Sequence, residues 1–166
     1  MPNHHGPRVA GGRWGGGVWV GDIIFTRCAG PCPRMTRQMK LIQDALPAGS
    51  RARLVTLTTD PDYDTPQVLK AYGERFEADF NRWMFLTGSK QEIAALAIYG
   101  LKLTAIEKKA EERQDPADLF IHSTILVVVD QHGRLRGIFE TEGEGVDPAL
   151  ERSKVLEMVR QLERER

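Results

Sequence analysis

Two cysteines, Cys28 and Cys32, are the residues of this chain whose type and spacing best suit chemistry. They are the only cysteines among 166 residues, and two in a chain of this length do not form a disulfide framework. In the segment "FTRCAGPCPRM" a strand-like run ends before Cys28, and Pro33 marks a helix start, where N–H groups and the helix dipole are expected to stabilise a thiolate. The spacing lets both sulfurs face one point. The pair could therefore bind a soft metal ion or cycle between dithiol and disulfide.

Other residues with donor atoms follow patterns that favour structural roles. Met35 and Met39 recur at helical spacing with apolar neighbours, which favours core packing over thioether ligands. His132 lies in the sequence "DQHG" and is interpreted as a turn residue. Three aspartates are spaced like the start of a calcium loop but lack its glycine and late glutamate. We interpret them as part of a structural or partner-facing loop: Asp60, Asp62 and Asp64.

The elements that must position the cysteine pair follow from the pattern of apolar residues. Early strands alternate with helices, which implies parallel pairing with helices on both faces, and a closing hairpin makes the sheet mixed. The order predicts an α/β fold of thioredoxin-like type, three-layer α/β/α, with a central mixed sheet. Strands are predicted at residues 18–26, 52–60, 83–88, 123–130 and 134–140. Helices are predicted from Pro33 to Pro47, at 67–76, at 89–100, and from near Asp147 onward.

Composition bounds the classes of protein that fit. The balance of 23 basic and 23 acidic residues argues against a nucleic-acid partner, because polyanion binders carry a basic excess. No apolar run approaches the roughly 18 residues of a membrane span, so no transmembrane segment is expected. Residues 1–17 are predicted to form a flexible glycine-rich tail, and residues 18–166 one compact domain. The tail lacks a signal-peptide core, so either the protein stays in the cytoplasm or its leader or anchor is missing from the sequence.

Four blocks in one order resemble the SCO/SenC family: "FTRCAGPCPRMTRQM", "TTDPDYDTP", "WMFLTG" and "FIHSTILVVVDQHGRLRG". The resemblance covers the chain from about Val18 to its C-terminus. These are copper-binding thioredoxin-fold proteins that assist assembly of the binuclear copper centre of cytochrome c oxidase. The resemblance implies that Cys28, Cys32 and His122 bind Cu(I) or Cu(II). A lone histidine before an apolar strand is otherwise more often structural, and Ile121 stands here where the family commonly has Asp.

The resemblance leaves more than one function open. It implies a copper metallochaperone whose partner is the copper-bearing subunit of cytochrome c oxidase or another copper protein. It also implies a place in the cell envelope or periplasm. The alternative is a thiol-disulfide oxidoreductase in which Cys28 and Cys32 form the redox-active disulfide; that chemistry does not need His122. A peroxide-reducing enzyme ranks third, because Thr26 and Arg27 suit it but the doubled cysteine motif does not.

Overall fold

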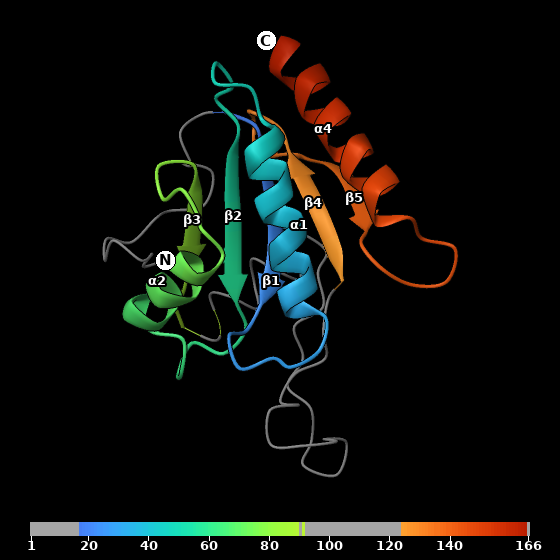
Figure 1. Cartoon of the computed structure of the whole chain (residues 1–166). Helices are drawn as coiled ribbons and strands as arrows, with labels where there is room; N and C mark the ends of the chain where they lie inside the picture. The colour runs from blue at the N-terminus through green and yellow to red at the C-terminus, as the bar shows by residue number, and fades with distance from the viewer. Residues whose placement is uncertain (1–16, 90, 92–123, 166) are drawn as a thin grey trace.

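The computed structural model describes residues 17–89, 91 and 124–165 (Figure 1). Their strands and helices follow in the predicted order. The strands are β1 (Trp19–Ile24), β2 (Arg53–Thr58), β3 (Trp83–Leu86), β4 (Ile125–Val129) and β5 (Leu135–Glu140). The helices are α1 (Cys32–Ala45), α2 (Pro66–Arg75) and α4 (Pro148–Arg164). Most of the predicted helix at 89–100 and most of the predicted tail lie outside the described residues.

The five strands form one mixed sheet in the order β3-β2-β1-β4-β5. β1 pairs with β2 and β2 with β3 in parallel, whereas β4 pairs with β1 and with β5 antiparallel. The predicted mixed sheet with a closing hairpin is therefore confirmed. Because β1 and β2 are parallel neighbours, their carboxyl termini lie side by side at the same end of the sheet. The loops that lead from them into α1 and α2 lie together at that end (Figure 1).

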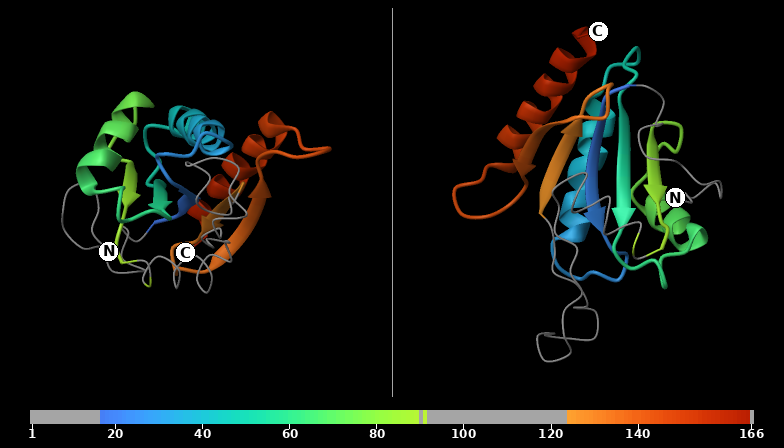
Figure 2. Two further views of the ribbon diagram at one scale, coloured as in Figure 1. Left: turned by 90° about the horizontal axis from the view of Figure 1, so that it is seen from below. Right: turned by 180° about the vertical axis from the view of Figure 1, so that it is seen from behind.

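The described helices cover one face of the sheet (Figure 2). The helix layer predicted for the other face stays a prediction, because residues 92–123 lie outside the described part of the chain. A single apolar cluster joins all three described helices to the face that they cover, with Met35 and Met39 of α1, Leu69 of α2 and Val155 of α4 fully buried. The prediction that the two methionines pack in the core is thus confirmed. A second cluster lies on the opposite face of the sheet. None of the described helices is both long and apolar enough to cross a membrane.

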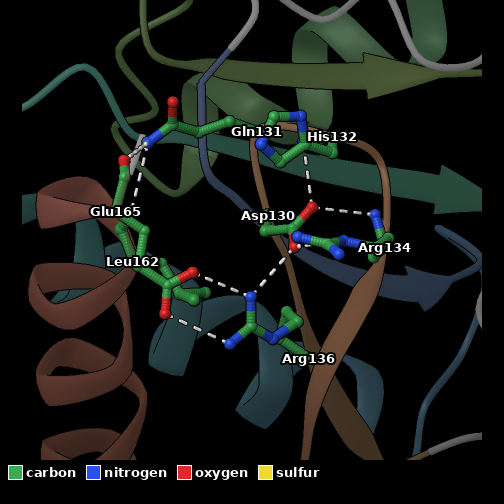
Figure 3. A network of polar contacts seen from close by, with 7 residues as sticks. All are labelled: Asp130, Gln131, His132, Arg134, Arg136, Leu162 and Glu165. Carbon is green, nitrogen blue, oxygen red and sulfur yellow. Dashed lines mark hydrogen bonds and ion pairs between the residues drawn. The ribbon is translucent and has the colours of Figure 1, made fainter.

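The turn between β4 and β5 is organised by the buried carboxylate of Asp130, which is 3% exposed. It accepts hydrogen bonds from the backbone N–H groups of His132 (2.9 Å) and Arg134 (3.0 Å). It also accepts from Nε of Arg134 at 3.0 Å and from a guanidinium N–H of Arg136 at 3.1 Å (Figure 3). The interpretation of His132 as a turn residue is confirmed. This turn lies at the end of the sheet opposite the cysteines, because β4 runs antiparallel to β1.

The β4–β5 connection also binds the C-terminal end of α4. The Arg136 guanidinium contacts the Glu165 carboxylate at 2.9 Å as well as Asp130. Gln131 Nε2 donates to the backbone carbonyls of Leu162 (3.1 Å) and Glu165 (3.0 Å), which end the helix (Figure 3). The carbonyls at a helix end have no partner within the helix, so these side-chain donors stabilise the C-terminus of α4.

The close approach of α2 to the aromatic core makes Gly73 a testable position. A Cβ atom built there would meet Phe80 at 2.8 Å and Phe85 at 3.0 Å. Alanine favours a helix over glycine by about 1 kcal/mol, but overpacking against rings costs about 1–3 kcal/mol. We therefore expect Gly73→Ala to lower the free energy of unfolding, measured by urea denaturation. Gly49→Ala, which meets no atom within 4 Å, is the control, and an equal effect of both changes would contradict the prediction.

Candidate metal centre

The structure places both motif cysteines in the core at the start of α1. Cys28 lies in the β1–α1 loop and is 6% exposed, and Cys32 is the first residue of α1 and is 2% exposed. In this structure no disulfide bond joins the two sulfurs. The Cys28 backbone N–H donates to the Phe25 carbonyl at 3.1 Å, which turns the loop back toward β1. Thr36 donates from Oγ1 to the Cys32 carbonyl at 2.9 Å, which fixes the first turn of the helix.

The electrostatic state of the pair differs from the sequence-based expectation. A hydrogen bond with Cys28 raises the pKa of the Cys32 thiol far above its usual range, and burial raises that pKa further. The charges of Cys28 and Asp22 act in the same direction. The expectation of a thiolate is therefore wrong for Cys32 in the metal-free protein, because the hydrogen bond with Cys28 and burial both favour the protonated thiol. A bound cation must displace the Cys32 thiol proton.

The loop that carries Cys28 is tied to the end of β2 by Asp64, which is fully buried. The Asp64 carboxylate accepts from the backbone N–H of Thr26 at 3.0 Å and also from its hydroxyl. The Thr58 hydroxyl donates to the same carboxylate at 2.6 Å. Burial raises the pKa of Asp64, although these hydrogen bonds oppose the shift. The backbone two residues before Cys28 is thus held by a residue of the neighbouring loop.

A second contact between the same loops joins the partly exposed Arg27 to the buried Asp60. Arg27 donates from Nε (3.0 Å) and from a terminal N–H (2.6 Å) to the Asp60 carboxylate. Its guanidinium carbon also lies 4.3 Å from the centroid of the Tyr63 ring, a cation–π arrangement. The prediction that these aspartates have a structural role is therefore confirmed for Asp60 and Asp64, since both carboxylates hold the loop that carries Cys28 in place.

One residue near the pair was not singled out by its sequence. Asp22 is a fully buried acid in the middle of β1. Burial raises its pKa from 3.8 to about 7, while hydrogen bonds from Thr56 and from its own backbone oppose the shift. The available signal was a lone acidic residue inside the apolar run "VWVGDIIF".

The third predicted ligand, His122, lies outside the described residues. Within the described ranges, no group of three or more His, Cys, Asp or Glu side chains could hold a metal ion. The structure thus brings Cys28 and Cys32 together, and the role of His122 stays a prediction. The two sulfurs are soft donors, which select Cu(I) or Zn(II) over hard ions. The donors that the structure describes therefore fit a thiophilic cation and leave room in its coordination for a further ligand.

Comparison with known proteins identifies the class of this fold and site. The family model described as SCO1/SenC matches residues 1–157. The chain therefore belongs to the SCO1/SenC family. It is similar to the SCO1 protein homolog of Bacillus subtilis (strain 168), with 35% identity over 135 residues that cover 80% of this chain and 67% of that protein. It is also similar to a Stutzerimonas stutzeri protein whose name proposes copper binding, with 34% identity over 115 residues, 68% of this chain and 53% of that protein.

Solved structures of the same family share the fold. A SCO1/SenC family lipoprotein from Bacillus anthracis str. Ames has a TM-score of 0.80 and 27% identity, covering 98% of this chain and 90% of that one. BsSco, described as a member of the Sco family of cytochrome c oxidase assembly proteins with a disulfide switch, has a TM-score of 0.78 and 30% identity. That match covers 99% of this chain and 90% of BsSco. The predicted thioredoxin-like fold with a central mixed sheet is confirmed by this likeness.

Proposed function

We propose that this chain is a copper-binding assembly factor that holds copper through Cys28, Cys32 and His122. The observation that carries the proposal is the pair of buried thiols, in hydrogen-bond contact with each other at the start of α1. Two thiolates and an imidazole match the preferences of copper. The name of the Stutzerimonas stutzeri relative also supports copper as the metal.

The chain's own residues suit a cargo site better than a permanent one. Asp64 and Asp60 hold the cysteine loop from the neighbouring loop, so the two sulfurs are kept close together. Both cysteines are buried in the core, so little of either sulfur is exposed to bulk water. A set of three ligands leaves a coordination position open to a ligand of the receiving protein, and copper can then move by ligand exchange.

The partner and the location follow from the family. We propose that the receiver is the copper-bearing subunit of cytochrome c oxidase or another copper protein, since BsSco is described as a cytochrome c oxidase assembly protein. We propose a cell-envelope or periplasmic location on the ground that the Bacillus anthracis relative is a lipoprotein.

An anaerobic titration of the reduced protein with Cu(I), in competition with a chromogenic chelator, tests the proposed site. We expect one tightly held copper ion per chain, and a loss of affinity of more than about tenfold in both Cys32→Ser and His122→Ala. His132→Ala is the matched control, because only the backbone of His132 bonds to Asp130, and it should bind as the wild type does. Binding that is weak, or that ignores His122, would contradict the three-ligand site.

The second candidate is a thiol-disulfide oxidoreductase that acts on the cysteines of a partner protein. The contact between the two thiols favours it, as does the disulfide switch of BsSco. One thiolate would attack a partner disulfide, and the other would resolve the mixed disulfide. The titration separates the two functions, since dithiol exchange needs both cysteines but does not need His122.

A further inference from the structure

The side chains of β1 alternate between the two faces of the sheet, and this places Asp22 beneath α1. Val20 and Ile24 belong to the apolar cluster on the helix-covered face, whereas Trp19 and Ile23 belong to the cluster on the opposite face. Asp22 therefore points to the same face as the cysteine pair. It is paired in register with Thr56 of β2, so it lies inside the sheet rather than at an edge.

The hydrogen bonds of Asp22 leave one of its oxygens without a donor. The Thr56 hydroxyl donates to Asp22 Oδ1 at 2.6 Å, and Trp83 Nε1 donates to the same hydroxyl at 2.9 Å. Asp22 Oδ2 has no hydrogen-bond partner among the described residues. A buried acceptor without a donor is costly, and more so when it is charged. A proton on Oδ2 would remove that charge, which agrees with the pKa of about 7 that burial gives this carboxyl.

The ionisable groups on which the charge of Asp22 acts, among the described residues, come from α1 and α2. The charge of Asp22 raises the pKa of both Cys32 and Tyr72, so all three lie within electrostatic reach. The Tyr72 hydroxyl lies 2.8 Å from Thr36 Oγ1, and burial raises the pKa of Tyr72 well above its usual range. Tyr72 therefore stays a neutral phenol near pH 7. With its pKa of about 7, Asp22 can accept a proton near that pH.

We propose that Asp22 is an internal proton acceptor for the cysteine pair when Cu(I) is loaded. The inference rests on the proposed function. Two S–H bonds break and two S–Cu bonds form; one proton forms an O–H bond at Asp22 Oδ2, the other passes to solvent, and no electron moves. Two thiolates around Cu(I) carry a net negative charge, and an ionised Asp22 would add a second one in the same buried region. Protonation of Asp22 removes that repulsion, which is strong where the effective dielectric constant is low.

The number of protons released per Cu(I) tests the proposal, measured with an indicator dye in weakly buffered solution. At about pH 6 Asp22 already holds its proton, so the wild type and Asp22→Asn should release the same number. At about pH 8 the ionised Asp22 retains one proton, so the wild type should release about one fewer than Asp22→Asn. Comparison of the two proteins at each pH cancels any proton that His122 contributes.

Tyr72→Phe is the matched control, because it removes another buried hydroxyl near the cysteines but no proton acceptor. It should release as many protons as the wild type at both pH values. Infrared difference spectroscopy of the wild type gives a second readout that needs no variant. On loading at about pH 8 with Cu(I), the C=O band of a protonated carboxyl group should appear.

The outcomes distinguish a failure of the proposed copper-binding function from a failure of the proposed role of Asp22. Failure to bind one Cu(I) per chain would overturn the proposed function. Tight binding with equal proton release by the wild type and Asp22→Asn at the higher pH, or with no new carboxyl band, would overturn the role of Asp22 alone. A pH-dependent difference of about one proton, together with the band, would support it.

Discussion

Replacement of Asp64 by alanine should lower the free energy of unfolding by about 3–5 kcal/mol. The carboxylate is fully buried and accepts hydrogen bonds from the Thr26 N–H, the Thr26 hydroxyl and the Thr58 hydroxyl. Alanine leaves these three donors buried without an acceptor, and each unsatisfied group costs about 1–3 kcal/mol, partly relieved by water that enters the space. Urea denaturation followed by the fluorescence of buried Trp83 measures the change.

The same change should weaken copper binding under conditions in which the variant is still folded, because Thr26 lies two residues before Cys28 and loses its anchor. Asp64→Asn retains one acceptor oxygen and should fall between the wild type and alanine in both measurements. Asp44→Ala removes an exposed carboxylate that pairs with Lys40, and its effect should stay within about 0.5 kcal/mol. An Asp64→Ala protein as stable as Asp44→Ala would show that the two loops are not held together by this carboxylate.

Local signals in the sequence were sufficient for most of the fold. The helices predicted at 67–76 and from near Asp147 begin at Pro66 and Pro148, and the residue before each proline caps its helix. Thr65 accepts from Val68 N–H at 3.3 Å, and Asp147 accepts from Ala149 N–H at 3.0 Å. A cap and the proline after it act within one turn, so the sequence alone specifies them. The predicted strand at 18–26 is longer than β1, which ends at Ile24. The Thr26 N–H bonds to Asp64 instead of continuing a strand.

The site was predicted less completely, because its supporting contacts join distant parts of the chain. Cys28 and Cys32 were found from their spacing, but the bond from Thr26 to Asp64 spans 38 residues. Such a contact depends on β1 and β2 being neighbours in the sheet, which no local pattern states. The raised pKa of Cys32 has a different origin, because its largest cause is the hydrogen bond with Cys28 only four residues away, and burial in the assembled core adds to it. His122 was identified only through the family resemblance, and its place at the site remains a prediction.

Asp130 is expected to give the domain a stability that depends on pH. Burial raises the pKa of its carboxyl, but hydrogen bonds from Arg134, Arg136 and His132 outweigh burial and hold that pKa well below its usual range. In the unfolded chain an aspartate takes up its proton at about pH 3.9. The unfolded state therefore binds the proton first as the pH falls. The contribution is complete above about pH 5 and is lost progressively below about pH 4.

Asp130→Asn should therefore cost about 2–3 kcal/mol of unfolding free energy near pH 7, and clearly less near pH 3.5. Asparagine keeps one acceptor oxygen but turns an amide N–H₂ group toward the donors of Arg134 and Arg136, at any pH. Urea denaturation of both proteins at the two pH values measures the gap, and other carboxyl groups cancel in the difference. Asp44→Asn, at an exposed ion pair, should show a gap within about 0.5 kcal/mol at both pH values. A gap for Asp130→Asn that stays constant with pH would mean that the ionised carboxylate is not what holds the β4–β5 turn against the end of α4.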